Sequence, residues 1–276
     1  MSTTNLYTEN DIIFLQENYA KYGPKYCAKI LNKNPDAVGA KAKRMGIKKI
    51  GYEKHNSMQK VNPEQFYNIN TPEIAYFLGF FWADGNIIYR LNKTSNYYGI
   101  RLEIQSEDAD YILSILNKLG VWAISKRKRK TNWKETTIIT TNSKDIFNFL
   151  KEHDYLEKSY KEPTKILDKI PENLRMYWWR GYFDGDGSIY LYKRFKKLEF
   201  SSTYEYQWLE CVNLIKNLNI NKYHIFRQIS KKGHKSSKFF IYRKNDIQTI
   251  FNYFLQSNYG LPRKTKKIHE FTEKFK

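Results

Sequence analysis

The hydrophobic and polar positions of this chain follow one order of elements twice. An apolar stretch of helical length precedes two strand-like runs, a helix, two further strand-like runs and a last helix, and this order is read first over residues 71–168 and again over 169–276. A repeat of this length indicates two copies of one fold related by a pseudo-twofold axis. The sequence therefore predicts an α+β fold of two αββαββα copies.

A smaller helical unit precedes the repeat. Gly23-Pro24 breaks a first helical stretch, and Asn34-Pro35 begins a last helix with basic residues on one side. Three short helices with a basic third one are the layout of a helix-turn-helix DNA-binding module, which is predicted for residues 1–47. The alternative is a three-helix bundle with a solvated basic face. The candidate DNA contacts are Lys41, Lys43 and Arg44. Residues 48–70 are polar and lack periodicity, so they are interpreted as a linker.

The first helix of each copy carries small residues on one face. They recur every four positions, which places them on the same side of a helix. Small side chains allow two helix backbones to approach closely, whereas the bulky aromatic residues between them are expected to fill the core of their own copy. The two helices are therefore predicted to form the interface between the copies. The interface candidates are Ala75, Gly79 and Gly181.

Both helices end in Asp-Gly, and the two aspartates, Asp84 and Asp186, lie 102 positions apart (186 − 84). A carboxylate at the C-terminal end of a helix is disfavoured by the helix dipole, and two carboxylates brought together repel each other. A divalent cation removes this cost, and carboxylate and carbonyl oxygens suit Mg²⁺. The alternative is an apolar helix with an ordinary Asp-Gly cap, but two such ends in register within a repeat favour the metal site.

The charge of the chain points to a polyanionic partner. Lys and Arg number 48 against 28 acids, a formal net charge of +20, and the basic residues are spread along the chain among Tyr, Phe and Trp. This distribution favours nucleic acid over an anionic membrane surface, which a single basic amphipathic helix would bind. The absence of an apolar run of 18 residues predicts no membrane span. The two cysteines and five scattered histidines have no disulfide or zinc spacing.

The two helix ends, FLGFFWADG (77–85) and WRGYFDGDG (179–187), resemble the paired motifs of single-chain LAGLIDADG homing endonucleases. The resemblance covers residues 71 to about 270, and the N-terminal unit more weakly resembles the Myb-like or helix-turn-helix appendages of such enzymes. It implies a monomeric, site-specific DNA endonuclease that cuts both strands of double-stranded DNA across the minor groove and leaves short 3′ overhangs. It also implies Mg²⁺, on the order of two or three ions, with Mn²⁺ able to replace it.

The resemblance also implies roles for individual residues. Asp84 and Asp186 would bind the metal ions, with the backbone carbonyls of Ala83 and Gly185 as secondary ligands. A lysine near the end of each copy would lie close to the scissile phosphates. A polar residue on the second strand would organise water; Ser201 or Ser202 stands at this place in the second copy. The further catalytic candidates are Lys158, Lys264 and Gln105. The first motif departs from the family at Trp82, where the second motif keeps an aspartate, Asp184.

The resemblance implies that the two antiparallel sheets form a basic saddle over the DNA. The strand candidates for DNA contact are Arg90, Lys93, Arg101, Lys193 and Arg194. Two hairpins are expected to bind phosphates. Their candidates are Lys126, Arg127, Lys128, Arg129, Lys231, Lys232 and Lys235. The alternative for the run 125–130 is a solvated loop or an accidental nuclear-localisation-like stretch.

Two other functions stay open at this point. One is a non-cleaving nucleic-acid binder on the same scaffold, an intron maturase or a transcriptional regulator. The other is a structural or membrane-surface basic protein, which does not account for the paired Asp-Gly helices. The N-terminus has no signal-peptide pattern. The expected location is therefore the cytoplasm of a bacterial or phage-infected cell, or an organellar matrix, and not the outside of the cell.

Overall fold

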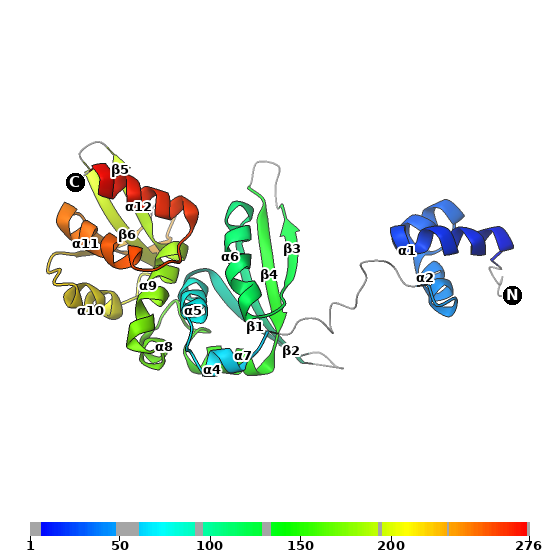
Figure 1. Cartoon of the computed structure of the whole chain (residues 1–276), viewed down its shortest axis with the longest axis horizontal. Helices are drawn as coiled ribbons and strands as arrows, with labels where there is room; N and C mark the ends of the chain where they lie inside the picture. Colours follow the sequence, from blue (N-terminus) through cyan, green and yellow to red (C-terminus); the bar gives the residue numbers. More distant parts are fainter. Residues whose placement is uncertain are drawn as a thin grey trace. The chain divides into compact units, whose positions relative to one another are not determined.

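The computed structural model describes residues 7–47, 61–91, 96–128, 134–192, 195–230 and 232–274. The chain divides into two units, Met1–Met58 and Gln59–Lys276, which are described separately (Figure 1). No helix in the described ranges is long and apolar enough to cross a membrane.

The N-terminal unit contains α1 (Glu9–Leu31) and α2 (Pro35–Arg44). The path of α1 breaks at Gly23, whose φ of 77° lies in the left-handed region, so the predicted break is present. The side chains of Thr8 and Asn34 accept hydrogen bonds from the first turns of the two helices, as N-caps do. A small core holds the helices together through Leu15, Cys27, Ala28 and Val38.

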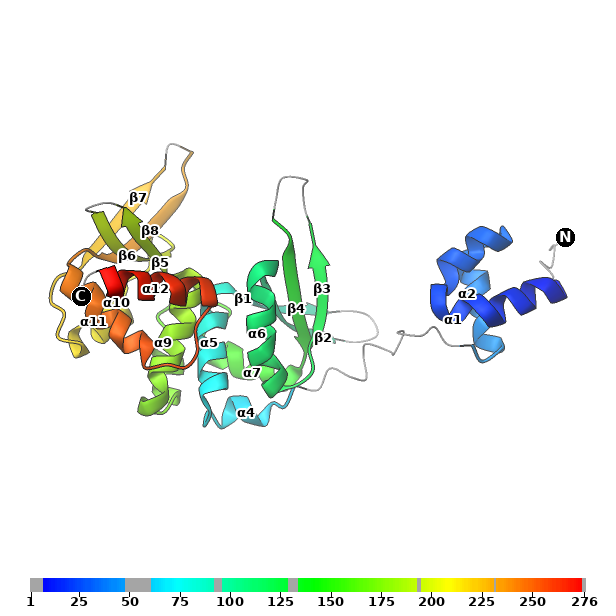
Figure 2. The ribbon, with the colours of Figure 1, turned by 45° about the horizontal axis from the view of Figure 1, so that its top comes forward.

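The second unit contains both copies of the repeat (Figure 2). The first copy runs through α5 (Pro72–Asp84), β1 (Gly85–Leu91), β2 (Asn96–Gln105), α6 (Ser106–Leu119), β3 (Ala123–Arg127), β4 (Thr136–Asn142) and α7 (Lys144–Glu152). The second runs through α9 (Glu172–Asp186), β5 (Ser188–Tyr192), β6 (Phe195–Ser202), α10 (Leu209–Asn217), β7 (His224–Ile229), β8 (Lys235–Ile241) and α11 (Lys244–Leu255). The αββαββα order is therefore confirmed, and each copy is followed by one more helix, α8 (Thr164–Lys169) or α12 (Pro262–Lys274).

Each copy forms an antiparallel sheet of four strands. The strand orders are β1-β2-β4-β3 and β5-β6-β8-β7, so the two sheets have the same topology. Every second residue of the central strand β2 is buried, including Ile100, Leu102 and Ile104, because one face of the sheet packs against helices. Leu198 and Phe200 do the same on β6. The predicted α+β fold is confirmed.

The linker predicted for residues 48–70 is too long. Val61 pairs with Gly120 in an isolated β-bridge, and α4 (Glu64–Tyr67) packs near α7. Val61, Phe66 and Ile69 are buried in the core of the second unit. Sequence periodicity missed this segment because its three apolar anchors are separated by polar residues and one short helix.

Candidate nucleic-acid cleavage site

Two helices, one from each copy, cross with their backbones in contact. A methyl group built on Gly79 of α5 would lie 1.9 Å from the carbonyl oxygen of Trp178, and one built on Gly181 of α9 would lie 2.1 Å from the carbonyl oxygen of Tyr76. Only glycine fits at either position. The structure places both predicted interface glycines at this crossing, and the third candidate, Ala75, is fully buried.

The crossing brings the C-terminal ends of α5 and α9 together. A methyl group on Gly185 would lie 2.2 Å from Cβ of Ala83 and 3.3 Å from Oδ2 of Asp84. Asp84 and Asp186 therefore occupy neighbouring helix ends. The glycines that follow them, Gly85 and Gly187, have extended backbones with φ of −77° and −73°. They are needed for space and not for a left-handed cap, because a methyl group on either would lie 2.3 or 2.2 Å from a phenylalanine ring.

The surroundings favour the protonated forms of the two carboxylates. Burial and, after it, the negative charge of Asp84 raise the pKa of Asp186 to about 6, against the opposing effect of Lys158 and Lys264. Asp84 is more open to solvent than Asp186, but burial by the surrounding protein raises its pKa too. A cation bound between the two carboxylates would favour their ionised forms.

A lysine caps each helix end. Lys158 donates to the carbonyl oxygens of Phe81 at 3.2 Å and Ala83 at 2.7 Å. Lys264 donates to the carbonyl oxygens of Phe183 at 2.7 Å, Gly185 at 3.3 Å and Gly187 at 2.6 Å. The carbonyls of Ala83 and Gly185 lie in the last turns, where a helix leaves its carbonyls unpaired, whereas those of Phe81 and Phe183 also accept from the backbone N–H groups of Gly85 and Gly187. Burial lowers the pKa of both lysines to about 8.

The oxygen atoms at these helix ends fit a hard divalent cation. Mg²⁺ is commonly held by one or two carboxylates and keeps several waters, and Asp84 and Asp186 supply two carboxylates. The carbonyl oxygens of Ala83 and Gly185 already accept from lysine, but each has a second lone pair. Over the described ranges, no cluster of three or more His, Cys, Asp or Glu side chains suits a metal ion. A cation here would depend on these two carboxylates, carbonyls and water.

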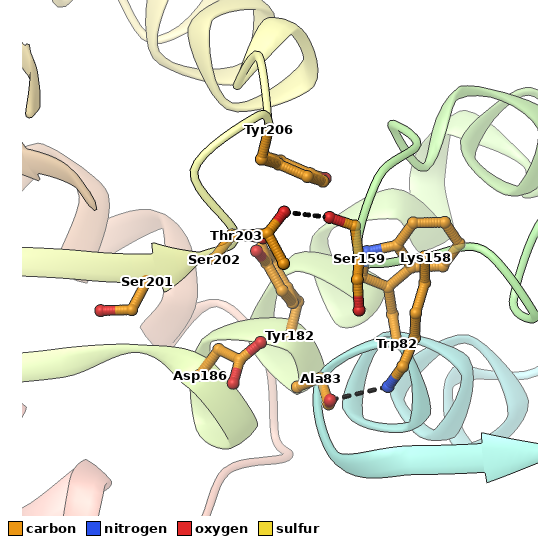
Figure 3. Close-up of a pocket in the computed structure, with 10 residues that line it drawn as sticks. All are labelled: Trp82, Ala83, Lys158, Ser159, Tyr182, Asp186, Ser201, Ser202, Thr203 and Tyr206. Carbon is orange, nitrogen blue, oxygen red and sulfur yellow. Dashed lines mark hydrogen bonds between the residues drawn. The ribbon is translucent and has the colours of Figure 1, made fainter. Parts of the chain in front are cut away.

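A cavity of about 160 Å³ opens beside Asp186 (Figure 3). Its wall includes Lys158 from the first copy and the end of β6, with Ser201 and Ser202, from the second copy. Ser201 and Ser202 are the two predicted counterparts of Gln105 in the second copy. Gln105 itself is exposed at the end of β2 and accepts a hydrogen bond from Lys134 at 3.4 Å. The two halves of the site therefore differ in the polar groups that they offer.

A buried ionic network beside the site was not identified from the sequence. Asp184 is completely buried, and its Oδ2 accepts hydrogen bonds from Tyr76 at 2.7 Å, Arg180 at 3.1 Å and the backbone N–H of Leu261 at 2.8 Å. Arg180 also donates to Thr265 at 2.6 Å. The network joins α5 to α9 and holds the chain on both sides of Lys264. The available signal was the i, i+4 spacing of Arg180 and Asp184.

The structure describes most of the basic residues predicted to contact DNA. The exposed ones are Lys43, Arg44, Arg90, Lys126, Arg127, Lys128, Lys232 and Lys235. Arg101 is half-buried and pairs with Glu103 at 2.6 Å, and the ammonium group of Lys41 lies 5.5 Å from the centre of the Tyr7 ring. Five further candidates lie outside the described residues: Lys93, Arg129, Lys193, Arg194 and Lys231.

Each copy matches a family of known domains. The WhiA LAGLIDADG-like domain matches residues 73–157, and the LAGLIDADG-like domain matches residues 173–254. The uncharacterized protein MJ0398 of Methanocaldococcus jannaschii is 25% identical over 239 residues, which cover 79% of this chain and 78% of that protein.

Solved structures share the fold. A mutant of I-SmaMI has a TM-score of 0.51 at 16% identity and covers 79% of this chain and 90% of its own. The meganuclease I-SmaMI bound to uncleaveable DNA has a TM-score of 0.51 at 14% identity and covers 74% of this chain and 89% of its own. The chain therefore contains two LAGLIDADG-like domains, one in each half, and each consists of a helix that ends in aspartate followed by a four-stranded sheet and its helices. The DNA-binding role of the N-terminal unit stays a prediction.

Proposed function

We propose that the protein is a site-specific endonuclease that hydrolyses both strands of a long, asymmetric duplex with Mg²⁺ as cofactor. The observation that carries this proposal is the meeting of Asp84 and Asp186 at two helix ends, each flanked by a buried lysine. Two acids and two lysines in a pseudo-symmetric arrangement suit two similar reactions, one on each strand. With both copies on one chain, the protein acts as a monomer.

The side chains of the site have two roles, cation binding and stabilisation of negative charge. Asp84 and Asp186 hold the cation, which when bound supplies an activated water and stabilises the charge of the leaving oxygen. Lys158 and Lys264 stabilise negative charge at the phosphates, because an ammonium group in a partly dry site is more effective than one in water. Gln105 in the first copy and Ser201 or Ser202 in the second orient water at the ends of their strands. The products carry short 3′ overhangs from cuts across the minor groove.

The two sheets bind the duplex as a saddle. The exposed basic residues near the strand ends and hairpins neutralise phosphates, and the side chains between them reach the base edges of the major groove. The N-terminal unit adds affinity through the basic side of α2. A formal net charge of +20 is consistent with a long track of phosphate contacts.

A binder that does not cleave is the second candidate. It is favoured by one observation: the first copy matches a different domain family from the second, the WhiA LAGLIDADG-like domain. Trp82 also stands in the first motif where the second has Asp184. In this case the two carboxylates would serve regulation and not hydrolysis, and the partner would be DNA or a structured RNA.

The test is cleavage of a randomised duplex library, and of DNA that flanks the gene, by the full chain. Wild-type protein is incubated with Mg²⁺, Mn²⁺ or Ca²⁺ beside Asp84→Asn, Asp186→Asn and the control Asp110→Asn, an exposed acid of α6. Discrete double-strand cuts that need Mg²⁺ or Mn²⁺ and both site aspartates support the endonuclease. Tight binding without a cut in any metal overturns it and favours the binder, which is then tested on RNA.

A further inference from the structure

The two sheets present different side chains on the face that the helices leave open. Directly paired residues of an antiparallel sheet share a face, so the open face of each sheet follows from the register. In the first sheet Tyr97 pairs with Arg90, and Thr136 pairs with both Gln105 and Arg127, on the side opposite the buried residues of β2. The arginines of this open face are Arg90, Arg101 and Arg127. Hydrogen-bond donors dominate there, and Tyr97 lies across Gly99.

The open face of the second sheet is aromatic. We call it the aromatic face, and it consists of Tyr190, Tyr192, Phe226, Phe240 and Tyr242. Tyr190 pairs with Lys197, and Phe226 pairs with Lys238, on the side away from the buried Leu198. Tyr190, Tyr192, Phe226 and Tyr242 are 41%, 67%, 50% and 40% exposed, which is unusual for large apolar side chains on one surface. The described part of this face contains no arginine.

Neighbouring side chains pack on two rings of the aromatic face. The ammonium group of Lys197 lies over the Tyr190 ring at 4.4 Å and near the Phe240 ring at 5.5 Å. His224 stacks on Phe240 with ring centres 5.6 Å apart and planes at 18°. Phe226 is half-exposed and offers apolar ring surface, on which a methyl group can pack.

The lysines of the aromatic face are held by an acid. Glu199 is buried and accepts hydrogen bonds from Lys197 and, at 2.9 Å, from Lys238. Burial acts to raise the pKa of Glu199, but the two lysines outweigh it and hold the pKa below its usual value. Glu199 therefore neutralises one of these two positive charges within the protein, and the exposed rings add apolar contact to what this face offers a partner.

We infer that the second sheet binds a thymine-rich half-site through the C5-methyl groups of thymine, while the arginines of the first sheet bind a guanine-containing half-site. In the major groove, thymine is the base that presents a methyl group, which phenylalanine contacts, and guanine presents the two acceptors that arginine binds. This inference rests on the proposed binding of duplex DNA. It explains the asymmetry of the proposed target by the different side chains on the open faces of the two sheets.

The test removes thymine methyl groups one half-site at a time. The duplex is selected from a randomised library by the full chain in Ca²⁺, and each thymine of either half is then replaced by uracil, which lacks only the methyl group. A buried methyl group contributes about fourfold to affinity. We expect dissociation constants to rise about fourfold per uracil in one half-site, and by less than about twofold in the other.

A pair of variants identifies the sheet responsible. Phe226→Ala removes a half-exposed side chain of the aromatic face, and Ile229→Ala, on the opposite face of the same strand, is the matched control with 59% exposure. Phe226→Ala is expected to abolish the effect of uracil at one position or more, and Ile229→Ala is expected to leave it unchanged.

Three results overturn the inference. Uracil that weakens both half-sites equally, or neither, shows that the sheets do not divide the target in this way. Sensitivity to uracil that survives Phe226→Ala unchanged at every position assigns the methyl contact to another surface. If the library yields no bound duplex, the proposed DNA binding is wrong and the inference fails with it. This outcome differs from the other two because there is then no target in which thymine could be replaced by uracil.

Discussion

Asp186→Asn is expected to stabilise the metal-free protein while it destroys cation binding. The change replaces a carboxyl group with a neutral amide of nearly the same shape. In the folded chain the carboxylate is disfavoured by burial and by the charge of Asp84, and the amide avoids both costs. A residue that lowers stability in this way is typical of a functional site.

The size and sign of the effect follow from the pKa of Asp186, which burial raises from 3.8 to about 6. Each pH unit is worth about 1.4 kcal/mol, so the full effect is about 3 kcal/mol, and partial exposure reduces it to about 2 kcal/mol. Below pH 3.8 the group is protonated in both states and contributes no difference. Between pH 3.8 and about 6 the unfolded state loses the proton first, so stability falls as pH rises, and above about 6 the full cost is present.

Urea unfolding followed by tryptophan fluorescence measures this effect. All six tryptophans lie in the second unit, so their emission reports the unit that holds the site. The variant should exceed wild type by about 2 kcal/mol at pH 7 in EDTA, and the two should converge near pH 4. Asp110→Asn, an exposed change, should match wild type at both pH values.

Addition of Mg²⁺ gives the second half of the assay. A cation that binds only the folded state stabilises it, so Mg²⁺ should raise the midpoint of wild type and leave that of Asp186→Asn unchanged. The reasoning is refuted if the variant is less stable than wild type at pH 7, or if the difference is the same at pH 4 and pH 7. Equal stabilisation of both proteins by Mg²⁺ would place the cation elsewhere.

Three further predictions concern packing, the buried network and DNA binding. Gly79→Ala should lower the free energy of unfolding in urea by about 3 kcal/mol, because its methyl group would overlap the Trp178 carbonyl. The control Gly39→Ala, in an uncrowded part of α2, should raise stability by about 0.5–1 kcal/mol in thermal unfolding followed by circular dichroism. Equal effects of the two changes would contradict the close crossing of α5 and α9. Arg180→Met should lower the free energy of unfolding in urea by about 3–5 kcal/mol, because it leaves the Asp184 carboxylate buried without the guanidinium group that pairs with it. The double variant Arg180→Met/Asp184→Asn should lose less stability than Arg180→Met alone, and an additive loss would argue against a coupled pair. The affinity for duplex should fall about a thousandfold between 50 and 200 mM salt if about six phosphates are contacted, as measured by fluorescence anisotropy, and a fall below about tenfold would argue against a long phosphate track.

The sequence was sufficient to predict the architecture because the two copies of the repeat independently indicate the same order of elements. An apolar helix that ends in Asp-Gly is common, but two in register within the same order of elements predicted the paired helices, the two sheets and the adjacent acids. The glycines were correctly placed at the crossing, since only small residues every four positions satisfy it. The segment 61–70 was missed because its buried residues have no periodicity.

The parts of the site that the sequence did not predict depend on long-range contacts. The bond from Tyr76 to Asp184 joins residues 108 positions apart, and no local pattern marks it. The sequence indicated a lysine near the end of each copy, but it did not show that the two ammonium groups donate to carbonyl oxygens at the ends of α5 and α9, because these acceptors lie far from the lysines along the chain. Likewise, no sequence pattern marks the ion pair between Glu199 and Lys238, because Lys238 lies on a neighbouring strand and only the register of the sheet brings the two together.

The crossing of α5 and α9 also sets the timing of folding on the ribosome. The two motifs lie 102 residues apart (186 − 84), so α5 leaves the ribosome well before its partner has been made. At about 5–20 residues per second, the apolar face around Gly79 waits about 5–20 seconds for α9. During that interval the nascent first copy offers the very surface that a second nascent chain could occupy. We expect slower translation between the copies to increase swapped or aggregated products, and a chaperone that covers α5 to suppress them.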